Sequence, residues 1–213
     1  MSKELFAPLS PTAELATAPA TRRAVWMRSG WMRSVWMRSG GIILAGSALV
    51  AVCAHISLPL YFTPVPLSLA PFAVLVIGLL LRPRLAAATL GAYLAEGALG
   101  LPVFAPTLLA PGGLAHLLGP TGGYLLSYPL AAALIAFLVR RTNRGFAPAA
   151  LSAAAGSLVI LFCGALWLAI LTHASAQSVL KLAALPFLPG DALKVAAAAT
   201  LAAGWVRFRQ RIF

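Results

Sequence analysis

Four clusters of arginine divide this sequence into long apolar segments. The thirteen arginines lie at residues 22–38, 82–84, 140–144 and 207–211. Each segment between two clusters is long enough for two membrane-spanning helices of about 20 residues. Arginine-rich loops stay on the cytoplasmic side of a membrane. The spacing therefore predicts an all-α integral membrane protein with six transmembrane helices and cytoplasmic N and C termini.

The composition excludes a soluble protein. Hydrophobic residues make up 61% of the 213 and charged residues only 9%, whereas a soluble domain has about 25% charged residues. The net charge of +12 comes from the arginine clusters, so it indicates orientation in a lipid bilayer and not a nucleic-acid partner. We expect a multi-pass protein of the inner (plasma) membrane.

Two domains are predicted: a disordered basic tail over residues 1–40 and a six-helix membrane domain over residues 41–213. The tail carries three copies of a Trp-Met-Arg-Ser pentad at residues 26–40. A five-residue period matches neither helix nor strand and forms no single apolar face. A cleaved signal peptide ending near residue 54 is the alternative.

The predicted spans alternate with loops of different character. The outer segment 102–113 has no charge, three prolines and two glycines, which predicts irregular backbone. The apolar run 182–188 is too short to cross. The six predicted spans are residues 41–57, 66–81, 85–101, 114–139, 147–172 and 191–206.

Few ionisable residues remain once the arginine clusters and the tail are set aside. Glu96 lies in the outer half of the predicted third span, and Asp191 and Lys194 lie at the start of the predicted sixth span. Ionisable groups inside a membrane indicate function by default. Asp191 and Lys194 are three residues apart and share a helix face. They offer a carboxylate acceptor and an ammonium donor for a small molecule, or alternatively a helix N-cap with its salt-bridge partner.

A glycine-rich segment, Gly-Pro-Thr-Gly-Gly-Tyr at residues 119–124, allows close approach of backbone or ligand, with Tyr124 as an aromatic wall. No Gly-Lys-Ser/Thr follows, so this is not a phosphate-binding loop, and uphill transport would need partner subunits or ion coupling. The histidines are scattered at span ends, where we expect interfacial roles, and no metal site or cofactor is predicted. We also predict no catalytic residues and no enzymatic activity.

Several motifs together resemble the BioY family, the biotin-binding S components of energy-coupling factor (ECF) transporters. The resemblance extends over about residues 55–206. The motifs are Thr-Pro-Val-Pro-Leu at 63–67, Leu-Pro-Val-Phe-Ala at 101–105, Gly-Pro-Thr-Gly-Gly-Tyr-Leu at 119–125 and Pro-Gly-Asp-Ala-Leu-Lys at 189–194.

The resemblance implies a membrane subunit that captures biotin from outside for uptake, energised by a transmembrane T component and two ATPase subunits. It makes Asp191 and Lys194 ligand residues, with Asp191 accepting the ureido N–H groups of biotin and Lys194 donating to an oxygen. An apolar pocket formed by Tyr93, Phe104 and Tyr124 would hold the thiophane ring. The predicted substrate-binding residues are Asp191, Lys194, Tyr93, Glu96, Phe104, Thr121, Gly123 and Tyr124.

Glu96 departs from the family pattern, in which an apolar residue is expected, so its role rests on its position alone. It supports the alternative function, a self-sufficient secondary transporter that couples uptake of a small vitamin-like molecule to protons or sodium. A small membrane enzyme is the third class, and it would require turnover of a bound substrate.

Overall fold

The computed structural model describes residues 20–58, 60, 63, 65–106, 112–143 and 145–212, and the side chains within these ranges except those of residues 20–36, 176, 182–183 and 211–212. The chain divides into two compact units, Met1–Gly41 and Ile42–Phe213. Each unit is described by itself.

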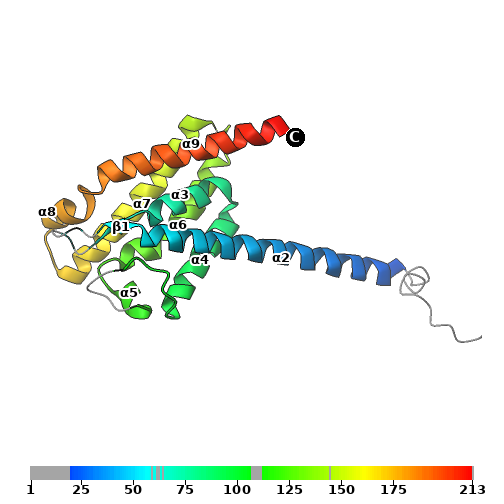
Figure 1. Ribbon diagram of the computed structural model, residues 1–213, viewed down its shortest axis with the longest axis horizontal. Helices are drawn as coiled ribbons and strands as arrows, with labels where there is room; N and C mark the ends of the chain where they lie inside the picture. The colour runs from blue at the N-terminus through cyan, green and yellow to red at the C-terminus, as the bar shows by residue number, and fades with distance from the viewer. Residues whose placement is uncertain are drawn as a thin grey trace, which may run out of the picture. The chain divides into compact units, whose positions relative to one another are not determined.

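The described backbone of the first unit is helical. Helix α2 spans Ala20–His55 (Figure 1), so its first part contains the three pentads. The disordered, basic tail over residues 1–40 stays a prediction, although the backbone from Ala20 onward is helical here. A helix requires only consecutive backbone hydrogen bonds, and a five-residue side-chain period does not prevent them. Residues 1–19 lie outside the described residues, and the domain boundary at residue 40 stays a prediction.

The second unit is a helical bundle with one short hairpin. In it β1 (Ser57–Leu58) pairs antiparallel with β2 (Leu67–Ser68), between the first two predicted spans. The helices that follow are α3 (Ala70–Leu80), α4 (Pro83–Ala98), α5 (Leu114–Leu118), α6 (Gly122–Val139), α7 (Phe146–Thr172), α8 (Ala176–Val179), the π-helix η1 (Leu180–Ala184) and α9 (Leu188–Ile212).

The fourth predicted span is two helices instead of one. Backbone at Gly119 is extended (φ −79°, ψ −174°) and ends α5, and Pro120 has no N–H to continue the helical ladder. The chain restarts as α6 at Gly122, where an added Cβ would lie 1.9 Å from the carbonyl oxygen of Leu117. The apolar pattern continues through this break, which is why the hydropathy alone predicted one span.

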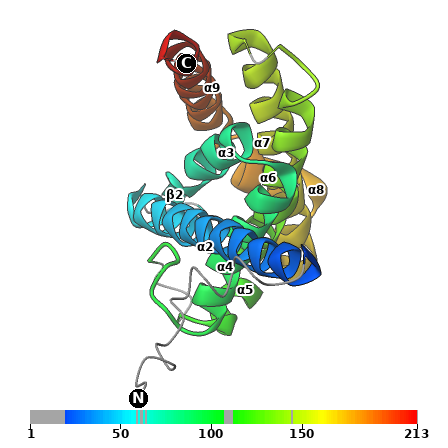
Figure 2. The same cartoon turned by 90° about the vertical axis from the view of Figure 1, so that its right-hand side faces the viewer.

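Close helix packing in the bundle depends on small residues. Helix α6 packs against α3, α4 and α7, and α9 packs against α3 and α7; Figure 2 shows α3 between α9 and α6. Ile135 of α6 is fully buried. A Cβ added to Gly78 of α3 or to Gly156 of α7 would lie within 2.8 Å and 2.3 Å of its side chain. Such glycines bring helices together in lipid, where hydrophobicity does not drive their association.

Three helical segments have the length and composition of membrane spans in the part of the chain that the structure describes: Met37–His55, Gly122–Val139 and Phe146–Thr172. The protein is thus a multi-pass membrane protein. Helix α3 has 11 residues and α4 has 16, both shorter than the usual 20 or so. The six-span count and the sidedness stay predictions.

Candidate functional site

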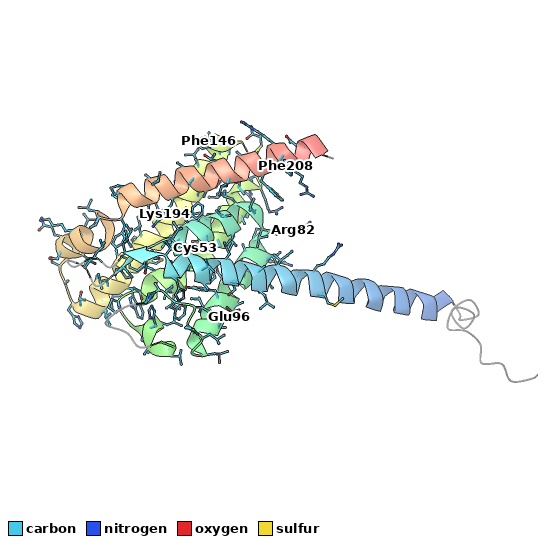
Figure 3. All side chains as sticks on the ribbon, in the orientation of Figure 1. Cys53, Arg82, Glu96, Phe146, Lys194 and Phe208 are labelled. Atoms are coloured by element: carbon cyan, nitrogen blue, oxygen red, sulfur yellow. The ribbon has the colours of Figure 1, made fainter. Side chains whose placement is uncertain are left out.

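An internal cavity lies at the helix ends opposite to those that carry arginine. Along α6 the cavity-lining Tyr124 precedes Arg140, and along α9 Asp191 precedes Arg207; Figure 3 shows Lys194 and Arg82 toward different ends of the bundle. The lining comes from elements distant in sequence. It comprises Ala54, Val65, Pro66, Ser68, Ala70, Pro71, Tyr93, Ala105, His116, Thr121, Tyr124, Leu125, Tyr128, Ile160, Leu161, Phe187, Asp191 and Lys194.

A buried polar network forms one wall of this cavity. The Asp191 carboxylate accepts a hydrogen bond from Lys194 Nζ at Oδ1 (3.2 Å) and another from Ser157 Oγ at Oδ2 (3.0 Å). The side chains of Asp191 and Lys194 are each 11% exposed, and Ser157 is buried. A charge held this deep needs such partners, because an unpaired buried carboxylate is strongly disfavoured.

The N-cap alternative for Asp191 does not match the structure. Helix α9 begins at Leu188, and the backbone N–H of Asp191 donates to the carbonyl of Phe187 (2.8 Å). Asp191 is therefore inside the first turn, with its side chain in the cavity. The other half of that alternative, a salt bridge to Lys194, is present.

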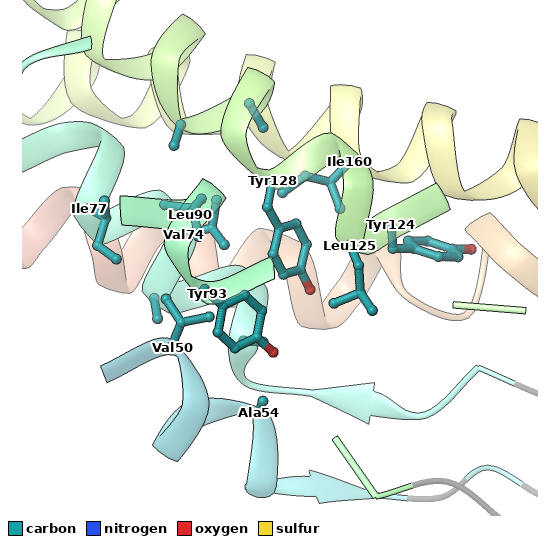
Figure 4. Packing of buried hydrophobic residues seen from close by; sticks show 14 of the residues in the cluster. Val50, Ala54, Val74, Ile77, Leu90, Tyr93, Tyr124, Leu125, Tyr128 and Ile160 are labelled. Carbon is teal, nitrogen blue, oxygen red and sulfur yellow. The ribbon is translucent and has the colours of Figure 1, made fainter. Parts of the chain in front are cut away.

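Aromatic side chains form the middle of the cavity. The rings of Tyr93 and Tyr128 stack with centroids 6.5 Å apart, and Tyr124 lies 6.3 Å from Phe187. Figure 4 shows Tyr93 and Tyr128 beside each other, with their hydroxyl groups directed to the same side. The Tyr93 hydroxyl donates to the carbonyl of Val103 (3.2 Å). These rings provide an apolar surface for a small molecule.

Helix α5 contributes a further part of the cavity lining. His116 is 3% exposed and stacks on Phe104, with centroids 5.0 Å apart and planes at 28°. Phe104 in turn meets Tyr93 edge-on at 5.4 Å. Because burial disfavours the imidazolium, the pKa of His116 lies below its ordinary value. The interfacial role predicted for this histidine is wrong, because the break before Gly122 folds α5 inward; His55 and His173 are exposed.

The structure brings five of the eight predicted site residues to the cavity. They are Tyr93, Thr121, Tyr124, Asp191 and Lys194. Phe104 lies behind the lining, in contact with Tyr93 and His116.

Glu96 and Gly123 are placed elsewhere. The Glu96 carboxylate accepts a hydrogen bond from Ser47 of α2, and it does not line the cavity. Gly123 faces α7, where an added Cβ would lie 2.1 Å from Trp167 Cβ and 2.7 Å from the carbonyl oxygen of Cys163. Its place in the motif therefore reflects helix packing.

Sequence reasoning missed four residues of the site. Tyr128 follows Tyr124 by four residues, so a helical-face argument would have found it. His116 precedes the glycine-rich motif by three residues, a weak signal. Ser157 and Phe187 had no such signal in the sequence. Only the packing of α7 and α9 brings Ser157 to Asp191 and Phe187 to the cavity.

Fold and site together define a helical membrane protein built around an aromatic-lined cavity with a buried ion pair, the usual construction of a small-molecule binding site. No cluster of metal-ligating side chains occurs among the described residues.

The model of the BioY family matches residues 27–211. The chain is 41% identical over 155 residues to a probable biotin transporter BioY of Pyrococcus horikoshii, covering 73% of this chain and 88% of that one. It is 35% identical to the biotin transporter BioY of Thermotoga maritima, covering 76% and 92%. A crystal structure of the S component for biotin from an ECF-type ABC transporter matches with a TM-score of 0.73 and 26% identity, covering 83% and 93%.

This chain belongs to the BioY family, so the resemblance drawn from its motifs is confirmed. It is a transport protein and not an enzyme.

Proposed function

We propose that this chain is the S component of an ECF transporter, and that it captures biotin from outside the cell. In this proposal residues 41–213 cross the plasma membrane six times, with the tail and both termini in the cytoplasm. The arginine distribution supports that orientation, since the cavity then lies toward the outside. The names of the relatives and the likeness to a biotin S component support the ligand.

The observation that carries the proposal is the buried Asp191–Lys194–Ser157 network beside stacked aromatic rings. The ureido ring of biotin has two N–H donors and one carbonyl acceptor. Asp191 is the acceptor available for the N–H groups and Lys194 the donor available for the carbonyl. The rings of Tyr93 and Tyr124 supply apolar surface for the thiophane ring.

In this proposal, entry of biotin makes the Asp191–Lys194 pair exchange part of its internal bonding for bonds to the ureido group.

Equilibrium binding of biotin to the purified full chain in detergent, without ATP, tests this function. We expect selective binding of biotin over riboflavin and thiamine. Asp191→Asn should weaken binding at least about tenfold, because it removes charge-assisted bonds and leaves Lys194 unpaired. Glu96→Gln, outside the cavity, is the matched control and should change the Kd less than about twofold. Absence of selective biotin binding would overturn the proposal.

In this proposal, partner subunits supply the energy for uptake. They are a transmembrane T component and two ATPase subunits. The sequence contains no Gly-Lys-Ser/Thr nucleotide motif. Vesicles containing this chain alone should bind biotin without concentrating it, and accumulation should require the partners and ATP. Accumulation that is driven by a proton or sodium gradient and lost in Glu96→Gln would establish the ion-coupled alternative, which the bonding of Glu96 to Ser47 outside the cavity does not favour.

A further inference from the structure

Two walls of the cavity carry buried polar side chains, and only one of them is satisfied internally. On α9, Asp191 bonds to both Lys194 and Ser157. On α5, His116 is 97% buried and lines the same cavity. Within the described part of the chain, its ring nitrogens have no hydrogen-bond partner.

Burying an imidazole whose ring nitrogens have no hydrogen-bond partner costs free energy, unless a bound ligand provides that partner. A neutral histidine has one N–H donor and one acceptor nitrogen, and buried polar groups are nearly always hydrogen-bonded. Stacking on Phe104 at 5.0 Å holds the ring against one wall. A polar atom of a molecule in the cavity is therefore the natural partner of His116.

The charged side chains in the cavity favour one of these two walls, α5 over α9, as the place for a ligand carboxylate. A ligand carboxylate placed against Asp191 would meet a like charge, and the Lys194 ammonium that offsets this charge is already bonded to Asp191 at 3.2 Å and is the donor proposed for the ureido carbonyl. The α5 wall has no acidic side chain among the described lining residues. The helices α5 and α9 contribute to the cavity separately: α5 packs on α4 and α6, whereas α9 packs on α7 and α3.

We propose that His116 binds the carboxylate at the end of the ligand's tail, donating its ring N–H to a carboxylate oxygen. This inference rests on the proposed function, because it takes biotin as the ligand with its ureido ring at Asp191 and Lys194. His116 then recognises the charged end of the ligand, and the stacked Phe104 ring positions the imidazole.

The test compares biotin with its methyl ester, which keeps both rings and the tail but has no negative charge. His116→Phe keeps an aromatic ring against Phe104 and removes both nitrogens. We expect it to weaken biotin binding about tenfold and ester binding less than about threefold, since a charge-assisted bond is lost only with biotin. His116→Gln retains an N–H donor and should recover most of the biotin affinity. His55→Gln, at an exposed histidine, is the control and should change neither Kd.

The outcomes separate the two proposals. Wild-type chain that fails to bind biotin contradicts the function itself. Wild-type binding with equal losses for biotin and ester in His116→Phe contradicts the role of His116 alone. If His116→Phe does not fold, His116→Ala takes its place: equal affinity losses for biotin and ester in His116→Ala, or no recovery of biotin affinity in His116→Gln relative to His116→Ala, would count against carboxylate recognition.

Discussion

Ser157 of α7 donates a hydrogen bond to Oδ2 of Asp191 over 3.0 Å, joining α7 to α9 across 34 residues of sequence. Lys194 bonds to the other carboxylate oxygen. Asp191 is thus held from two directions, and its orientation toward the cavity depends on a hydroxyl from another helix.

Removing that hydroxyl should weaken ligand binding. We expect Ser157→Ala to raise the Kd for biotin about threefold to tenfold, because Asp191 loses one bond that orients it and stabilises its charge. Ser152→Ala is the matched control on the same helix, since among the described residues the Ser152 hydroxyl bonds only to the carbonyl of Pro148, and it should leave the Kd unchanged. Equal effects of the two variants in isothermal calorimetry would contradict the orienting role of Ser157.

Gly97 lets Phe104 pack closely against α4. A Cβ at Gly97 would lie 2.0 Å from the end of the Phe104 ring, which is buried and cannot swing into solvent. Gly97→Ala should displace Phe104 and with it the stacked His116, weakening biotin binding severalfold. Gly91→Ala on the same helix meets nothing within 4 Å and should bind like the wild type. A Gly97→Ala protein with unaltered affinity would show that the cavity tolerates movement of Phe104.

The bond between Ser47 and Glu96 joins α2 to α4, with Ser47 fully buried. Ser47→Ala should lower the Tm by about 2 °C, because an interhelical hydrogen bond in a membrane protein contributes on average about 0.6 kcal/mol. The Kd for biotin should stay within about twofold, since neither residue lines the cavity. Thr200→Ala is the control, because the Thr200 hydroxyl bonds within its own helix. A large loss of affinity in Ser47→Ala would connect α2 to the site.

Acid should destabilise the ligand-free protein through His116. Its pKa is lowered by burial in the folded state, so between the two pKa values the unfolded chain binds more protons than the folded one. The stability is complete above the ordinary histidine pKa of about 6.5 and falls as the pH drops below that value.

Thermal unfolding between pH 7.5 and 5 tests this dependence. His116→Gln should lose less Tm on acidification than the wild type. The two proteins differ only at residue 116, so the difference between their pH profiles reports on His116. Identical pH profiles would mean that His116 does not titrate differently on folding.

Much of this protein could be predicted from local pattern alone. Apolar segments between arginine clusters indicate a helical membrane protein, because burying helical backbone in lipid depends on composition along the chain. The motifs at residues 101–105, 119–125 and 189–194 indicated the BioY family, now confirmed. Asp191 and Lys194 could be paired from their spacing of three, which a helix converts into a shared face.

The break between α5 and α6 shows where local pattern fails. Hydropathy is continuous from residue 114 to 139, so nothing in it distinguishes one helix from two. Gly119 and Pro120 end α5, and the packing of the Gly122 backbone against Leu117 places α5 so that His116 is buried.

The partners of the charged residues were likewise decided by tertiary structure. Glu96 and Asp191 are both lone carboxylates in apolar sequence, and the sequence could not say which one faces a cavity. Glu96 lies beside α2 and bonds to Ser47, whereas Asp191 lies between α7 and Lys194. The sequence by itself determined which segments are apolar helices and which family they form, because those properties are local. The tertiary structure decided which side chains meet, because contacts between residues 34 or 49 positions apart depend on how whole helices pack.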